Sequence, residues 1–213
     1  MSLRPVQDLV DAAVRALTVG AQRPFAPRDE LIRGIDLIRD LAFDGTPEPD
    51  NQPIVDRHLH ELEVNDPLAA ALLAALRTAT HLLNWKDMHN SSYGEEPGME
   101  HFCDNFSYTA LAEPRRWAKG ISVPSTKVGL TFTLQGPKTY YPDHAHKAVE
   151  IYYLIAGKGL WKRGGEPWVE RHPGEIILHT AGMRHAMQTG DQPLISMAVW
   201  ISDVDSPIAV VRT

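Results

Sequence analysis

The chain has 213 residues, 43% of them hydrophobic and 23% charged, with a formal net charge of -6. These values fit a globular protein that can bury a full core, as one large domain or as one domain with an extension. No run of Lys or Arg supplies the basic patch that nucleic acid or an anionic membrane surface requires. Cys103 is the only cysteine, which excludes an intrachain disulfide and a cysteine-based metal site.

The N-terminal stretch of residues 6–19 is interrupted by charged residues, so it does not resemble an export signal. No segment reaches the roughly 18 apolar residues of a membrane span. We therefore expect a cytoplasmic protein that binds a small molecule and neither nucleic acid nor membranes. A homodimer is also open, because an apolar helix face could pack on another subunit.

Amphipathic helices are predicted in the first part of the chain. Apolar residues recur there at three- and four-residue spacing, and the stripes run through residues 6–17, 31–42 and 68–83. Asp66 is the expected N-cap of the third helix, with Pro67 at its first helical position.

Residues 86–120 are harder to assign. They contain the turn-forming stretch 90–98, which is rich in Asn, Ser, Gly and Pro. We expect a long loop that either contributes to a site or serves as a linker. Residues 1–120 are thus interpreted as a helical N-terminal extension with its connecting loop.

From about residue 121 the apolar period changes from helical to two, which is typical of β-strands. Short strands separated by Gly, Pro and Asp turns, at a spacing of about 8–12 residues, predict an all-β sandwich or barrel. The clearest strands are expected at residues 128–134, 149–155, 168–171, 175–179 and 194–201. The predicted fold is mostly β, with a barrel over residues 121–213.

Two of the ten histidines open a His-x-His-x-x-x-Glu sequence, formed by His144, His146 and Glu150. These residues and Tyr152 have the same parity, so an extended segment would place them on one face of a sheet. In a small barrel one face is the interior, where unpartnered His and Glu side chains are costly to bury. A divalent transition metal would offset this cost, because imidazole and carboxylate groups are suitable ligands.

A second segment adds another histidine after a strand and a glycine turn. The two segments together resemble the paired motifs of the cupin superfamily. Gly174, Gly182 and His185 fall in the register of the second motif. Thr180 and Thr189 stand where that motif has Pro and Asn, but these are turn positions and not ligands.

The cupin resemblance covers roughly the last 90 residues. It implies a double-stranded β-helix, or jelly-roll, barrel in which His146, Glu150 and His185 hold one divalent metal ion. His144 is expected close by. The ligand types do not select between Zn, Fe, Mn, Ni and Co. His179 could also face the interior, but the motif selects His185.

Two tyrosines lie beside the predicted ligands. A phenol has a pKa of about 10, but a nearby divalent cation favours its ionised form. Tyr141 or Tyr152 could therefore act as a metal-activated general base. The alternative is that both rings only fill the mouth of the barrel.

The stretch from Tyr141 to Tyr152, the Gly-Met-Arg-His turn ending at His185, and Trp200 resemble a more specific family. This family is the cupin-type dimethylsulfoniopropionate (DMSP) lyases, in particular the DddQ-like group. The resemblance implies that Tyr152 is a further metal ligand and that Tyr141 and Tyr152 are the candidate bases. Whether His144 is a direct ligand stays open.

The resemblance further implies a β-elimination. A tyrosinate removes the proton α to the substrate carboxylate, and the C–S bond breaks to give dimethyl sulfide and acrylate. Aromatic rings stabilise a sulfonium cation by roughly 0.5–2 kcal/mol each. We expect Trp200 and Tyr140 to bind this group of the zwitterionic substrate, with Trp200 preferred because it shares parity with Ser196 and Ala198.

Two other functions are considered. A different metal-dependent cupin enzyme, such as a dioxygenase or an isomerase, would use the same ligands but would need open coordination positions. A metal-bound Tyr152 argues against that. A non-catalytic small-molecule-binding cupin is the other class, but sensors commonly carry a DNA-binding module, and no basic recognition helix is present. We place the lyase first.

Overall fold

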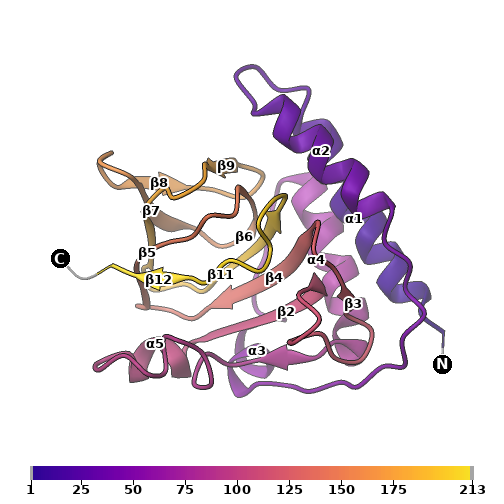
Figure 1. The fold of residues 1–213 in the computed structure, drawn as a ribbon, viewed down its shortest axis with the longest axis horizontal. Coiled ribbons are helices and arrows are strands. Elements are labelled where there is room, and N and C mark those ends of the chain that lie inside the picture. The colour runs from indigo at the N-terminus through magenta and orange to yellow at the C-terminus, as the bar shows by residue number, and fades with distance from the viewer. Residues whose placement is uncertain (1, 212–213) are drawn as a thin grey trace.

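The computed structural model describes residues 2–211, which form two facing sheets with the longest helices packed on one outer side (Figure 1). The helices are α1 Arg4–Gly20, α2 Arg28–Arg39, α3 Pro53–His58, α4 Pro67–Ala79 and α5 Glu100–Asp104, with a 3-10 turn η1 at Thr80–Leu82. The strands are β1 Trp85–Lys86, β2 Phe106–Glu113, β3 Val123–Pro124, β4 Gly129–Gln135, β5 Tyr140–Ala145, β6 Glu150–Ala156, β7 Gly159–Arg163, β8 Val169–Arg171, β9 Ile176–His179, β10 His185–Thr189, β11 Leu194–Trp200 and β12 Ala209–Val210.

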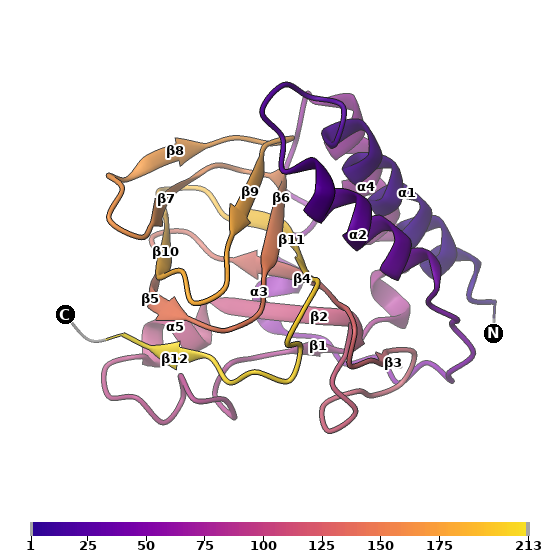
Figure 2. The same cartoon turned by 45° about the horizontal axis from the view of Figure 1, so that its top comes forward.

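Within residues 2–211, the larger sheet has seven strands in the order β1-β2-β4-β11-β6-β9, with β3 paired in parallel to β2. The smaller sheet has five, in the order β12-β5-β10-β7-β8. Figure 2 shows β5, β7 and β10 across the barrel from β6, β9 and β11. From β4 onward the chain alternates between the sheets except at the β7–β8 hairpin, so it forms the jelly-roll architecture that the cupin resemblance predicted.

The helices cover the outer face of the larger sheet. α1 packs against α2 and α4, and α4 packs on β6. Along β6, Ile151, Tyr153 and Ile155 face the helices and are fully buried. In α2, a Cβ atom added to Gly34 would lie 3.3 Å from Cγ2 of Ile201, so the small residue permits a close approach. One continuous apolar core therefore joins the helices to the barrel.

The three predicted amphipathic helices are confirmed as α1, α2 and α4. Asp66 caps α4 as expected, because its Oδ1 accepts a hydrogen bond from the backbone N–H of Ala69 at 2.8 Å. The helix ends at Ala79, where η1 begins, so it is shorter than the apolar stripe. Among the described residues, every helix is too short or too polar to cross a membrane.

The loop prediction for residues 86–120 was wrong for two segments, helix α5 and strand β2. These residues include β2, which pairs with β4 in the larger sheet. Seven of its eight residues are buried and a register shift falls after Ala110, so the strand lacks the alternating pattern that identified the others. The sheet therefore begins before residue 121, and the division into two domains at residue 120 stays a prediction.

Candidate metal centre and active site

A β-bulge in β5 decides which side chains enter the barrel. In the pairing of β5 with β10, His144 lies opposite His185 and Tyr141 lies opposite Met187. The three-residue separation of Tyr141 and His144 in β5 is thus matched by a two-residue separation of His185 and Met187 in β10. Pro142, which lacks a backbone N–H, occupies the irregular part of the strand. As a result Tyr141 and His144 both face the interior although their parities differ, and each is less than 5% exposed.

His146 and Glu150 approach each other from opposite sheets. His146 follows the end of β5, residues 146–149 cross the barrel, and Glu150 opens β6. The shared parity of these residues therefore does not come from one extended strand, as the sequence analysis assumed. They converge because the interior faces of the two sheets lie opposite each other. Both side chains are buried.

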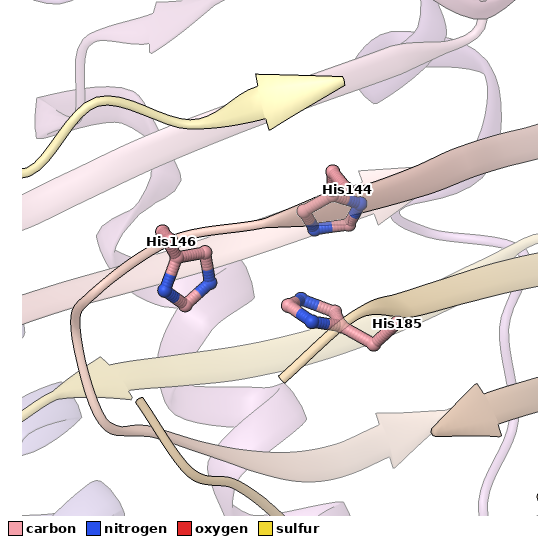
Figure 3. Close-up of side chains that lie close together, drawn as sticks. All are labelled: His144, His146 and His185. Carbon is pink, nitrogen blue, oxygen red and sulfur yellow. The ribbon is translucent and has the colours of Figure 1, made fainter. Parts of the chain in front are cut away.

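Three imidazoles meet inside the barrel. Figure 3 shows His144, His146 and His185 with their rings directed toward one another. The ring centroids are 4.0 Å apart for His144 and His185 and 5.1 Å apart for His146 and His185. One nitrogen of each ring lies within 4.8 Å of one nitrogen of the others, which is compatible with a shared metal ion.

The carboxylate of Glu150 lies at the centre of this group. Its Oε2 is 3.2 Å from Nε2 of His146, 3.3 Å from Nε2 of His185 and 3.2 Å from Nδ1 of His179. Its Oε1 accepts a hydrogen bond of 2.7 Å from Nε1 of Trp200. The structure thus brings together the predicted ligands His146, Glu150 and His185.

His179 is a member of the cluster that the sequence analysis set aside. It lies opposite Glu150 in the β6–β9 ladder, so both side chains point into the barrel. The side chain is fully buried, and its ring stacks on that of His185 at 3.8 Å. The alternation of residues in β9 indicates that His179 faces the interior, but the cupin motif selects His185 as the ligand.

The hydrogen bonds of the imidazoles leave nitrogen lone pairs inside the barrel. Three rings place Nδ1 against a backbone carbonyl oxygen, and the distances are 2.7 Å for His144 to Pro142, 3.0 Å for His146 to Ala148 and 2.8 Å for His185 to Met183. Donation from Nδ1 assigns Nε2 as the unprotonated nitrogen of each neutral ring. In these tautomers lone pairs of His146 and His185 face the Glu150 carboxylate, an arrangement that is compatible with a cation between them.

Two buried nitrogens support the same conclusion. Among the described residues, Nε2 of His179 and Nε2 of His185 have no hydrogen-bond partner. Unpartnered polar atoms are costly to bury, and coordination removes that cost. Imidazole nitrogens with one carboxylate form a suitable donor set for a divalent transition metal, so the residues present fit such an ion.

Electrostatics favour the ionised form of Glu150 and the neutral form of His144, but they favour the protonated form of His146. Burial opposes the charge of Glu150, but the contacts with His146, His179 and His185 outweigh it and hold the pKa of this carboxyl well below its ordinary value. Burial lowers the pKa of His144 well below its ordinary value, which keeps that ring neutral. For His146 burial acts in the same direction, but the hydrogen bond and charge of Glu150 raise its pKa.

Both predicted base candidates lie at this centre. Tyr141 stacks on His144, with ring centroids 4.2 Å apart and planes 11° apart. Tyr152 follows Glu150 on the interior face of β6, and its ring lies 5.5 Å from that of His179. Burial raises the pKa of both phenols well above the ordinary value, and the charge of Glu150 adds to the effect. In the protein alone, both tyrosines are therefore neutral at physiological pH.

A cavity of about 760 Å³ opens beside the cluster. Its wall includes Tyr141, Glu150, Tyr152 and Trp200. The Trp200 ring also stacks on His146, with centroids 4.3 Å apart, so this residue both lines the cavity and contacts the candidate ligands. A small molecule in the cavity would reach the metal centre and both tyrosines.

Two further residues of the cavity wall were missed by the sequence analysis. Tyr93, from the loop after β1, is fully buried, and its hydroxyl donates a hydrogen bond of 3.1 Å to the Tyr141 hydroxyl. Lys86 also lines the cavity, but its ammonium group is paired with both carboxylate oxygens of Glu113 at 2.7 and 2.8 Å. Neither residue belongs to a recognisable motif.

The structure does not bring Tyr140 to the site. Its side chain is 43% exposed on the outer face of β5, because the bulge turns Tyr141 and His144 inward instead. The Tyr140 hydroxyl donates to Oδ2 of Asp143 at 3.2 Å, and the ring lies 6.3 Å from that of Trp168. Tyr140 is not among the residues that line the cavity, so its contact with substrate stays a prediction that the structure does not support.

The buried histidines predict a pH dependence of stability for the metal-free protein. Burial lowers the pKa of His179 to about 4, although Glu150 favours its charged form. The unfolded chain takes up this proton near pH 6.5, so stability is lost as the pH falls from about 6.5 towards 4, by up to about 1.4 kcal/mol per pH unit. Urea unfolding at pH 7 and at pH 4.5 gives the free energy of unfolding at each pH. Between these two pH values the free energy of unfolding should therefore fall less in His179→Gln than in the wild type. His81→Gln, which removes an exposed histidine, serves as the control, and an equal loss in all three proteins would contradict the assignment.

The chain is similar in sequence and in fold to known proteins. A sequence model of a family described as dimethylsulfoniopropionate lyase matches residues 30–196. DMSP lyase DddQ of Ruegeria pomeroyi is 36% identical over 67 residues, and the match covers 32% of this chain and 33% of that protein, a third of its length. The DddL protein of Cereibacter sphaeroides is 26% identical over 195 residues, which cover 89% of this chain and 78% of DddL.

Solved structures share the fold. One from a crystallographic study of the DMSP lyases RdDddP and RnDddQII matches with a TM-score of 0.74 and 21% identity over 98% of both chains. The crystal structure of DddQ from Ruegeria pomeroyi matches with a TM-score of 0.69 and 21% identity over 96% of both chains. Since the family model spans most of the sequence, from α2 into β11, the chain belongs to the dimethylsulfoniopropionate lyase family, as its motifs predicted.

Proposed function

We propose that this protein is a metal-dependent carbon–sulfur lyase that cleaves DMSP to dimethyl sulfide and acrylate. Membership of the DMSP lyase family supports the substrate and the enzyme class. The observation that carries the metal dependence is the Glu150 carboxylate, which is buried among imidazole nitrogens at 3.2–3.3 Å. The adjoining cavity, with Tyr141 and Tyr152 in its wall, provides the place for the substrate.

His146, Glu150 and His185 would hold the metal, with Tyr152 as a further ligand and His144 as an additional nitrogen donor. The donor set is compatible with Zn, Fe, Mn, Ni or Co. When bound, the ion would supply positive charge that neutralises the substrate carboxylate and acidifies the carbon next to it. The deep pKa depression of Glu150 keeps one negative charge available for the ion.

Tyr141 is our preferred general base, and Tyr152 is the alternative. The Tyr141 ring is held against His144, and its side chain lines the cavity where the substrate would lie. In its ionised form, which a bound ion would favour, its oxygen would take the proton from the carbon α to the carboxylate. The electron pair of that C–H bond forms the new C=C bond of acrylate, and the C–S electron pair leaves on sulfur as neutral dimethyl sulfide. No general acid is needed for this leaving group.

Trp200 would bind the sulfonium group. One face of the indole stacks on His146, and the residue lines the cavity next to Ala198. Aromatic rings attract such cations through their quadrupole. Lys86, one of three cationic residues in the cavity wall, is paired with Glu113, so its charge is neutralised.

Gas chromatography of the headspace tests the reaction directly. Purified protein reconstituted with each candidate metal and supplied with DMSP should release dimethyl sulfide, and Glu150→Ala should release none because the centre loses its only carboxylate. Glu166→Ala removes a carboxylate from the exterior and should behave as the wild type. No dimethyl sulfide with any metal would exclude the lyase, and oxygen uptake with candidate substrates would then test a dioxygenase.

The two tyrosines should respond differently to removal of the hydroxyl. Tyr141→Phe should keep its metal content and lose about 10²–10⁴-fold in kcat, the usual contribution of a positioned base. Tyr152→Phe should also lose metal, because a ligand is removed. Metal analysis by mass spectrometry, combined with steady-state kinetics, separates the two cases. Wild-type activity in both variants would contradict the tyrosinate mechanism.

A further inference from the structure

The loop between β1 and α5 is tightly folded around Tyr93. Successive backbone hydrogen bonds run from Ser91 N to Met88 O at 3.1 Å, from Gly94 N to Ser91 O at 3.0 Å and from Glu96 N to Tyr93 O at 3.1 Å. A Cβ atom at Gly94 would lie 1.9 Å from a backbone oxygen, so glycine is required there. This compact turn directs the Tyr93 side chain inward, where it is fully buried.

Tyr93 contacts the proposed base directly. Its hydroxyl donates to the Tyr141 hydroxyl at 3.1 Å, and the two rings meet edge to face with centroids 5.4 Å apart. The Tyr93 ring also lies 5.2 Å from Phe102 and 6.1 Å from His144. The loop therefore brings a third tyrosine to the catalytic centre from outside the cupin motifs.

The Tyr141 ring itself cannot move freely. It is enclosed by His144 at 4.2 Å, Phe102 at 4.8 Å and Phe106 at 5.0 Å between ring centroids. These ring contacts do not fix the direction of the hydroxyl hydrogen or of the oxygen lone pairs, because the hydroxyl can rotate. The hydrogen bond from Tyr93 settles that direction, because one lone pair of the Tyr141 oxygen is then used as an acceptor.

We propose that Tyr93 is a positioning residue that orients the Tyr141 oxygen for removal of the substrate α-proton. The inference rests on the proposed function, in which Tyr141 is the base. Tyr93 keeps its own proton throughout: the α-proton passes to the Tyr141 oxygen, and the electron pair of the C–H bond becomes part of the new double bond. Tyr93 acts only through its hydrogen bond to the Tyr141 oxygen.

Tyr93→Phe tests this role, because it keeps the ring packing and removes only the hydroxyl. The kcat per bound metal should fall roughly ten- to a hundredfold, the effect of one hydrogen bond that orients the reacting oxygen. KM, metal content and the unfolding midpoint should stay as in the wild type. Tyr153→Phe is the matched control: Tyr153 faces the helices on the other side of β6, and its hydroxyl has no hydrogen-bond partner among the described residues.

A double-mutant cycle separates positioning from general packing. In the Tyr141→Phe background, where the acceptor hydroxyl is already gone, Tyr93→Phe should have no further effect on dimethyl sulfide accumulated over several hours. Two results would overturn the inference: Tyr93→Phe reduces activity by the same factor in the wild-type and Tyr141→Phe backgrounds, or Tyr93→Phe alone leaves kcat unchanged. In either case an active wild type still supports the lyase. A wild type that releases no dimethyl sulfide overturns the proposed function and this inference with it.

Discussion

One buried carboxylate determines the chemistry of this barrel. Glu150 has imidazole nitrogens of His146, His179 and His185 around one oxygen and the Trp200 indole on the other. In the neutral tautomers two of those nitrogens carry lone pairs rather than protons, so the group forms a buried donor set that is compatible with a metal ion. The proposed substrate, base and reaction all depend on that cation, since neither tyrosine is ionised without it at neutral pH.

The two sheets position the side chains of this centre from opposite sides of the barrel. Glu150 and His179 come from the larger sheet, whose outer face is covered by α1, α2 and α4, whereas His144 and His185 come from the smaller sheet. The bulge in β5 turns an additional residue, Tyr141, toward the interior. The helices therefore contribute packing to the wall that carries the carboxylate, and the loop after β1 contributes the Tyr93 hydroxyl.

Much of this architecture was predictable from local patterns. The helical stripes, the jelly-roll strands and the convergence of His146, Glu150 and His185 followed from periodicity and motif spacing. Other features depend on tertiary context, which the sequence does not display. β2 lacks alternation because both of its faces are buried, Tyr140 is turned outward by a bulge, and the roles of His179 and Tyr93 follow from cross-strand and loop contacts.

Anomalous diffraction from crystals of the zinc-loaded protein tests the central claim most directly. The account predicts one strong peak at the zinc absorption edge between the side chains of His146, Glu150 and His185, with both imidazoles bound through Nε2. A structure with no peak in the barrel, or with the zinc held only by residues on the surface, would contradict it.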